Sequence, residues 1–491
     1  TQGVSSAASD VYKRQIIVDT SIKMCGRSRC RYNSKVTRAA LELELYFILI
    51  QGGLPMTFPE IVKTTLWDII DEMSRSLSSF VKNPDKDFIR KRKLDFKKMM
   101  HLIISMESGS LNHELLKFFE YDSSVPTGSA FYQQRSKLSV SAFRHLLKEF
   151  NLKFPLEKFR GKYYLIACDG SEFNIARNPN NPDTFHEPNG KSLSGFNMVH
   201  TISLYEVCSK RYLDLEVQPG RLKNEFQAIC SLMDRYAYGG SPIFIADRGF
   251  SSYNVFAHAI ENHVDFLIRA KDLNVQRFLG VETLPDKLDT TIELLLTRTQ
   301  SKKKHKHPEK ESQYRYICKN IAFDYLDPDD ISDEYLLKLR IVCVEVSDGV
   351  FENIITTLSE EDFTPDDIKY CYNLRWGIET SFRDLKHTIG ATNLHSKKTE
   401  YVAFELWSKL ILYNFCSIII LHVPVKSMDR KYEYQVNFSL AMKICFDFLR
   451  GVAPPNLESL ISKYILPIRP DRNYARQHRV QKPLSFSYRF V

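Results

Sequence analysis

The chain has 491 residues, of which 43% are hydrophobic, and it carries a formal net charge of +9 with a pI near 8.8. This length predicts two to four domains and excludes a single small module, and the apolar fraction is that of a folded protein. The basic excess is modest, so whole-chain charge alone is weak evidence for a nucleic-acid partner. The ten cysteines include no C-x2-C pair, which argues against a zinc site even at Cys25 and Cys30 and favours free thiols in a reducing cytosol.

The N-terminal part of the chain contains a leader and a helical region. Residues 1–23 are polar, lack a starting methionine and show no periodicity, so we interpret them as a non-native or disordered leader. Residues 24–155 are mostly helical in pattern. Helices over residues 129–134 and 139–150, the second capped by Ser139, are either a helix-turn-helix pair that reads DNA or ordinary packed helices.

Two apolar runs end in aspartate. Residues 163–168 predict a buried strand that ends at Asp169, and residues 243–246 predict a second one that ends at Asp247. Either aspartate alone could be a turn or helix-cap residue, but two neighbouring strand ends can also hold two carboxylates side by side. Arg248 follows the second aspartate and is either a phosphate contact or a structural ion-pair partner.

The elements around these two strands predict a mixed α/β fold. Residues 198–207 and 212–217 predict strands, 224–238 a helix with Phe226 facing inward, 252–262 another helix and 264–269 a fifth strand. We therefore expect the first part of an α/β core over residues 156–270. Residues 271–363 are too many for a loop and carry strand patterns at 314–325, 337–346 and 350–357, which predicts a β-rich insertion.

Residues 364–390 predict an amphipathic helix, with Thr364 as its N-cap. The helical repeat places Tyr372, Arg375, Glu379 and Lys386 within an arc of roughly 60° on one face. A carboxylate beside two cations and a phenol is typical of a metal ligand with donors for phosphate oxygens around it. A solvated face with chance salt bridges would carry the same residue types.

The helix belongs to a second part of the core, over residues 364–425. Its apolar run at 406–425 is interrupted by Lys409 and Asn414, so we expect a buried helix and no membrane span. Residues 426–491 are expected to form C-terminal helices and a basic tail. Three basic clusters stand out; we interpret the first and last as DNA contacts and the second as a solvated loop. They are Arg90, Lys91, Arg92, Lys93, Lys97 and Lys98; Lys302, Lys303, Lys304 and Lys306; and Arg469, Arg472, Arg476, Arg479, Lys482 and Arg489.

Asp169, Asp247 and Glu379 together would form a carboxylate cluster, and like charges held close need a cation between them. Oxygen-only ligands suit two Mg2+ or Mn2+ ions, which can activate a water and stabilise the leaving oxygen of a phosphodiester. No serine, cysteine or histidine nucleophile of comparable quality is evident. The three acids therefore predict metal-dependent phosphodiester chemistry.

The helix motif resembles that of bacterial insertion-sequence transposases of the DDE type, in the IS-four group. The spacing of Tyr372, Arg375, Glu379 and Lys386 reproduces the Tyr-(2)-Arg-(3)-Glu-(6)-Lys signature of this group. The two strand-end aspartates stand in contexts like those of the first and second catalytic aspartates of the family. The likeness runs from residue 58 to the C-terminus and includes the strings at 129–147 and 355–379.

This resemblance implies a ribonuclease-H-like catalytic domain, a β insertion that contacts the transposon end, and an N-terminal DNA-binding region. It implies that the three acids ligate two ions and that Tyr372, Arg375 and Lys386 hold phosphates near the cleaved end. Trp376 would stack on a displaced base or belong to the core. The implied partners are double-stranded DNA with terminal inverted repeats and target DNA, bound by a homodimer in a bacterial cytoplasm, at the nucleoid.

The function expected from the sequence is a DNA transposase that cuts transposon ends and joins them to target DNA by hydrolysis and transesterification. Two alternatives remain: a domesticated relative that binds DNA without cutting it, and a general ribonuclease-H-like nuclease. The sequence does not reveal the end and target sequences, the host, or whether excision passes through a hairpin.

Overall fold

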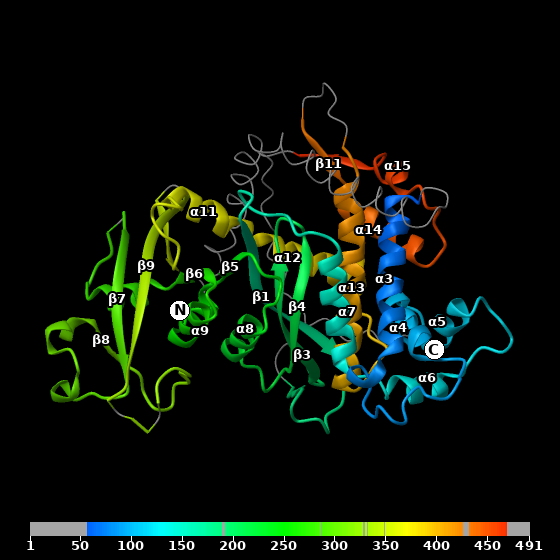
Figure 1. Cartoon of the computed structure of the whole chain (residues 1–491), viewed down its shortest axis with the longest axis horizontal. Coiled ribbons are helices and arrows are strands. Elements are labelled where there is room, and N and C mark those ends of the chain that lie inside the picture. The colour runs from blue at the N-terminus through cyan, green and yellow to red at the C-terminus, as the bar shows by residue number, and fades with distance from the viewer. Residues whose placement is uncertain are drawn as a thin grey trace.

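The computed structural model describes residues 56–188, 192–285, 287–327, 329–330, 332–347, 349–425 and 432–468. The expected leader, Cys25, Cys30 and the basic tail beyond residue 468 lie outside these ranges. The N-terminal region is helical, as expected, and its helices lie together at one end of the molecule (Figure 1). They are α3 (Phe58–Arg75), α4 (Phe96–Ser105), α5 (Leu111–Phe118), α6 (Gly128–Arg135) and α7 (Val140–Lys153), with a short 3-10 turn η2 (Leu77–Ser79).

One large mixed sheet runs through the rest of the molecule. Its central strands lie in the order β4–β3–β1–β5–β6, where β4, β3 and β1 are antiparallel and β1, β5 and β6 are parallel. A short strand β2 also pairs with β3. The bounds are β1 Tyr163–Ile175, β2 Phe185–His186, β3 Phe196–Glu206, β4 Arg211–Pro219, β5 Ser241–Ala246 and β6 Asp265–Ala270.

The first strand is longer than the sequence suggested. We predicted that it ends at Asp169, and this boundary is wrong, because β1 continues to Ile175. The polar Asp-Gly-Ser string has the composition of a turn, but antiparallel pairing with β3 holds it extended as far as the pair Ile175 and Asn197. Pairing with β5, in contrast, ends at Cys168. From Asp169 onwards, the β5 side of β1 is therefore free of that neighbour.

Helices cover both faces of the central strands (Figure 1). Helices α8 (Glu225–Asp234) and α9 (Tyr253–Glu261) pack on one face, where Ile166, Cys168 and Ile202 join them in one buried cluster. The other face is covered by α7 and by the C-terminal helices described below. Asn224 caps α8 and Ser252 caps α9, as expected from their short polar side chains. The expected inward position of Phe226 is wrong, since its side chain is exposed.

The insertion extends the same sheet. After β6 come α10 (Asp272–Leu279), β7 (Asp289–Thr297), the 3-10 turns η4 (Lys302–Lys304) and η5 (Pro308–Gln313), β8 (Tyr314–Tyr316), β9 (Glu334–Ser347) and β10 (Val350–Thr356). Strand β10 pairs with β6, and the order continues β10–β9–β7–β8. We predicted a strand over residues 314–325, but only the first three of these residues form one, as β8. Strand β7 was not predicted. The domain boundaries proposed from the sequence stay predictions.

The helical segment after the insertion begins as expected and then departs from a regular helix. Thr364 caps α11 (Pro365–Leu374) in a capping box with Asp367. Arg375 separates α11 from α12 (Trp376–Arg383), and a π-helical turn η6 (Asp384–Thr388) follows. The predicted apolar stripe is confirmed, because all six of its side chains are buried against the sheet and its neighbours. They are Ile368, Cys371, Ile378, Phe382, Leu385 and Ile389.

The long apolar helix α13 (Thr399–His422) lies in the middle of the helical part of the fold (Figure 1). Its length and composition would allow it to cross a membrane, but almost all of its apolar stretch is buried by other parts of the chain. It packs on α7, on β4 and on α14 (Phe438–Leu449). The expectation of a buried core helix is confirmed. The described chain ends with β11 (Tyr434–Val436), α15 (Leu457–Ile461) and β12 (Ile465–Pro467).

Candidate active site

Two of the three predicted acids are brought together by neighbouring parallel strands. Cys168 of β1 lies opposite Ala246 of β5 in the sheet register. Asp169 and Asp247 are the next residues along the two strands, so both lie just beyond the last pair between β1 and β5, at the same level. Beyond this point β5 gives way to the 3-10 turn η3 (Arg248–Phe250), for which Asp247 is the N-cap position.

Helix α12 brings the third acid, Glu379, to the same place. The side chains of Ile378 and Phe382 anchor the helix, because they are buried in the core that it shares with α13. A hydrogen bond of 2.7 Å between the Tyr212 hydroxyl and Ser381 Oγ ties it to β4. These contacts leave Glu379 on the side that faces Asp169, with about a third of its side chain exposed.

The guanidinium of Arg375 interacts with all three carboxylates. Its Nη2 lies 3.3 Å from Glu379 Oε1 and its Nη1 lies 3.8 Å from Asp169 Oδ2, while only 4% of its side chain is exposed. The ring of Trp376 lies 4.7 Å from the guanidinium carbon, in cation–π contact. Burial alone would lower the pKa of Arg375, but Tyr372 and the three acids raise it, so this residue is a permanent cation at the centre of the cluster.

The second aspartate has polar partners of its own. The hydroxyl of Tyr372 donates to Asp247 Oδ1 at 3.4 Å, and Arg269 Nη1 lies 3.8 Å from the same oxygen. Arg269 also pairs with the buried Glu352 at 3.1 Å. Neither Arg269 nor Glu352 was predicted, because the pairing of β5 with β6 brings Arg269 to Asp247 and the pairing of β6 with β10 brings Glu352 to Arg269.

The two aspartates titrate in opposite directions. Burial raises the pKa of Asp169 from 3.8 to about 6; Arg375 opposes this shift, and Glu379 and Asp247 add to it. Burial also acts to raise the pKa of Asp247, but Arg375, the backbone N–H of Arg248 and Arg269 together hold it below its ordinary value. Of the two aspartates, Asp169 is therefore the less favourably charged in this arrangement.

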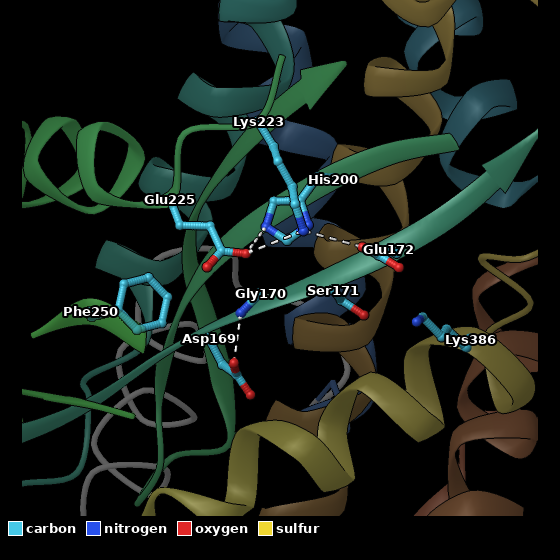
Figure 2. Close-up of a pocket in the computed structure, with 9 residues that line it drawn as sticks. All are labelled: Asp169, Gly170, Ser171, Glu172, His200, Lys223, Glu225, Phe250 and Lys386. Atoms are coloured by element: carbon cyan, nitrogen blue, oxygen red, sulfur yellow. Dashed lines mark hydrogen bonds and ion pairs between the residues drawn. The ribbon is translucent and has the colours of Figure 1, made fainter. Parts of the chain in front are cut away.

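A pocket of about 380 Å³ opens at Asp169 and is also lined by Lys386 (Figure 2). The ammonium of Lys386 lies 4.8 Å from the centre of the Phe173 ring, and burial lowers its pKa. The lysine lies in the π-helical turn, so the four signature residues do not belong to one regular helix as we expected. They nonetheless reach one region, with Tyr372 at Asp247, Arg375 among the acids and Lys386 at the pocket.

The donor set suits a hard divalent cation, because three carboxylates converge and Arg375 offsets only part of their charge. As they are arranged, however, no three histidine, cysteine, aspartate or glutamate side chains in the described part of the chain are grouped closely enough to hold one ion. The acids are joined by a guanidinium. Their role as metal ligands stays a prediction.

The remaining predicted residues are peripheral to the acids. Arg248 lies in η3, where its backbone N–H and its charge both act on Asp247. Trp376 is half-buried and packs against a core cluster beside Arg375. A DNA contact by either stays a prediction. The sequence reading missed His200, Lys223 and Glu225, which line the pocket with Asp169. The register of β3 against β1 places His200 opposite Glu172, and no local motif carries that information.

Comparison with protein families adds the deciding observation. The model of the family described as the transposase DDE domain matches residues 160–415, which is more than half of the chain and includes all three acids. The chain belongs to this transposase family. No curated protein matches it. Among solved structures, a cryo-EM structure of the piggyBac transposase synaptic complex with hairpin DNA matches with 10% sequence identity and a TM-score of 0.38, over 87% of this chain and 88% of the other.

The matched range includes every segment of the candidate site. It begins just before β1, which carries Asp169, and ends within α13, the helix that closes the core behind α12. The segments that bring together Asp169, Asp247 and Glu379 all lie inside the matched range. The sheet extension β7–β10 does too, and the helices α3 to α7 lie before it.

Proposed function

We propose that this transposase cuts the ends of a mobile DNA element and joins them to target DNA, as a member of the bacterial IS-four group. The observation that carries the proposal is the convergence of Asp169, Asp247 and Glu379, from three distant segments, around one buried arginine. The strand order β4–β3–β1–β5–β6, with its antiparallel and parallel halves, supports a ribonuclease-H-like core. The Tyr-(2)-Arg-(3)-Glu-(6)-Lys spacing supports the finer assignment.

Each residue has a role that follows from its place. Asp169, Asp247 and Glu379 would hold two Mg2+ or Mn2+ ions. When bound, such ions supply the Lewis acid that activates a water or a 3′-hydroxyl and stabilises the leaving oxygen. Tyr372 donates to Asp247 and fixes the orientation of that carboxylate. Arg375 carries a planar fork that suits a phosphate.

Lys386 acts from the pocket wall as a point charge for the DNA backbone. Burial keeps its ammonium poorly hydrated, which strengthens an interaction with an incoming phosphate. Arg248 and Trp376 stay secondary proposals, as a phosphate contact and as a stacking surface. The substrate we propose is double-stranded DNA with terminal inverted repeats, bound by a homodimer in the bacterial cytoplasm.

The test uses the purified chain with DNA that carries the inverted repeats flanking its reading frame. We expect Mg2+-dependent cleavage at the repeats and joined products, and we expect Glu379→Gln to bind the ends without cutting them. Nicking by Glu379→Gln in Mg2+ would overturn the assignment of Glu379. Binding of the ends by the wild type without any cleavage would support the domesticated relative instead, and cleavage indifferent to sequence would support the general nuclease.

A further inference from the structure

The pocket at Asp169 extends around the free side of β1, and its far half contains charged residues that the proposed chemistry does not use (Figure 2). Because pairing with β5 stops at Cys168, no strand of the sheet covers this side of Gly170. Asp169 reaches the pocket from the face of β1 that carries α12. Lys223, Glu225 and His200 reach it from the face that carries α8.

His200 forms the floor of this far half. Its ring lies directly on Gly170, where an added Cβ would be 2.9 Å from Cε1 and 3.0 Å from Nε2. The side chain is 3% exposed, and Nε2 lies 3.0 Å from Glu225 Oε1. Nδ1 is buried and has no hydrogen-bond partner among the described residues. A buried ring nitrogen left without a partner at the floor of a pocket needs one from a ligand.

In this half of the pocket, Lys223 is a cation that is only weakly paired with carboxylates of the protein. Its ammonium lies 3.4 Å from Glu172 and 3.7 Å from Glu225, distances that are long for charged pairs, and 41% of its side chain is exposed. Glu225 is instead held by His200, whose hydrogen bond lowers the pKa of that carboxylate. An anion in the pocket can therefore take Lys223 at little cost.

On the other side of the pocket is Lys386. Within the described part of the chain, no carboxylate lies at ion-pair distance from its ammonium, and the charge of Glu172 acts on it from farther away. The pocket thus has an ammonium on either side, a buried imidazole beneath and Asp169 at one end, and the carboxylates of Glu172 and Glu225 also line it beside Lys223. A volume of about 380 Å³ leaves room for a sugar-phosphate unit.

We propose that this half of the pocket is a second backbone subsite, in which Lys223 binds, beside the ring of His200, a DNA phosphate adjacent to the one at the acids. The proposal rests on the proposed function and adds to it: the strand that is cut would continue past Asp169, around the free side of β1, to the N-terminal end of α8. Glu225 would set the strength of this subsite, since it competes with the phosphate for Lys223.

The test measures binding of a fluorescein-labelled duplex of random sequence with a single-stranded 3′ tail, by anisotropy over a range of salt concentrations. Lys223→Ala should lower the salt slope of the affinity by about 0.9, the value for one lost phosphate contact. Glu225→Gln should bind about twofold to fivefold more tightly, because it frees Lys223 from a surface ion pair. The control Lys443→Ala removes an exposed lysine on α14, outside the pocket and the basic clusters, and should match the wild type.

The opposite signs make the test decisive. A merely structural role would weaken binding in both Lys223→Ala and Glu225→Gln, and that result would overturn the subsite. His200→Gln should also weaken binding, and Glu225→Gln keeps the test valid if the buried histidine variant does not fold. If Lys223→Ala binds and cuts end-repeat DNA as Lys443→Ala does, the subsite is wrong and the proposed function stands. If the wild type binds no DNA, both fail.

Discussion

The Nη2 atom of Arg375 lies 3.3 Å from the carboxylate of Glu379, which follows it by one helical turn, and the same guanidinium reaches Asp169. The cation of this site is thus part of the protein. Arg375→Gln would leave three carboxylates without their central charge. We expect it to lower the free energy of unfolding in EDTA by roughly 3 kcal/mol, the usual cost of breaking a buried ion pair.

The same substitution should increase the response to metal, because a divalent ion can then replace the lost guanidinium. Thermal unfolding over a Mg2+ titration should show a larger rise in Tm for Arg375→Gln than for the wild type. Arg383→Gln is the matched control, since Arg383 is an exposed arginine of α12, the helix that begins directly after Arg375. Equal Mg2+ responses in all three proteins would contradict the view that Arg375 substitutes for a cation.

Asp169→Asn tests the less favourably charged of the two aspartates. Its pKa of about 6 lies above the ordinary 3.8, so the folded state binds its proton more tightly than the unfolded state does. Between these two values stability falls as the pH rises, and at pH 8 the charged carboxylate costs about 3 kcal/mol. Without metal, Asp169→Asn should therefore be more stable than the wild type at pH 8, and this advantage should shrink at pH 5. Its DNA cleavage should be abolished.

Denaturant unfolding in EDTA at the two pH values measures this difference. Asp247→Asn is a sharp comparison, because the surrounding arginines hold the pKa of Asp247 below its ordinary value. That substitution should be destabilising at pH 8, the opposite sign. A loss of stability in both variants at pH 8 would mean that Asp169 is not strained in the folded protein.

Local sequence patterns predicted much of the candidate site. The apolar runs before the two aspartates predicted adjacent buried strands, and the Cys168–Ala246 register then places both acids at one level. The Thr364 capping box and the apolar stripe fixed the start and the buried face of the α11–α12 segment. These features depend on residues near one another in sequence, where propensity and periodicity act directly.

What escaped prediction depends on contacts between distant segments. The polar residues after Asp169 stay in a strand only because β3 pairs with them. Arg269 meets Asp247 through the pairing of β5 with β6, and His200 of β3 meets Glu225 where α8 packs beside that strand; no local pattern specifies either contact. The π-helical turn that carries Lys386 has no signature of its own, so a regular helix was the natural expectation and was wrong.

A histidine network should give the fold a pH dependence away from the acids. Both ring nitrogens of His258 in α9 contact a carboxylate. Nδ1 lies 2.8 Å from Asp234 Oδ1, and Nε2 lies 2.8 Å from Asp324 Oδ2. Burial acts to lower the pKa of His258, but these two hydrogen-bonded carboxylates raise it above 6.5. The protonated ring therefore stabilises the folded state fully below pH 6.5, and this contribution is lost as the pH rises through the raised value.

His258→Gln should accordingly be destabilised by roughly 1 kcal/mol at pH 6 and by less at pH 9, since both carboxylates are partly exposed. Denaturant unfolding at the two pH values provides the measurement. His263→Asn removes an exposed histidine just beyond the same helix and should show no such trend. A destabilisation of His258→Gln that does not change with pH would rule out an ionic contribution from the ring.

The substitution Gly170→Ala tests whether stability and cleavage depend on the close approach of His200 to β1. An alanine Cβ at this position would lie 2.9 Å from His200 Cε1 and 3.2 Å from Ile202 Cδ1, and the buried ring can move only by leaving Glu225. Gly170→Ala should therefore cost about 1–3 kcal/mol of stability and lower the cleavage rate, because Asp169 is the adjacent residue. Gly249→Ala is the matched control beside the other aspartate, where an added Cβ meets nothing within 4 Å. Equal stabilities and cleavage rates for the two variants would show that the strand can shift without disturbing the site.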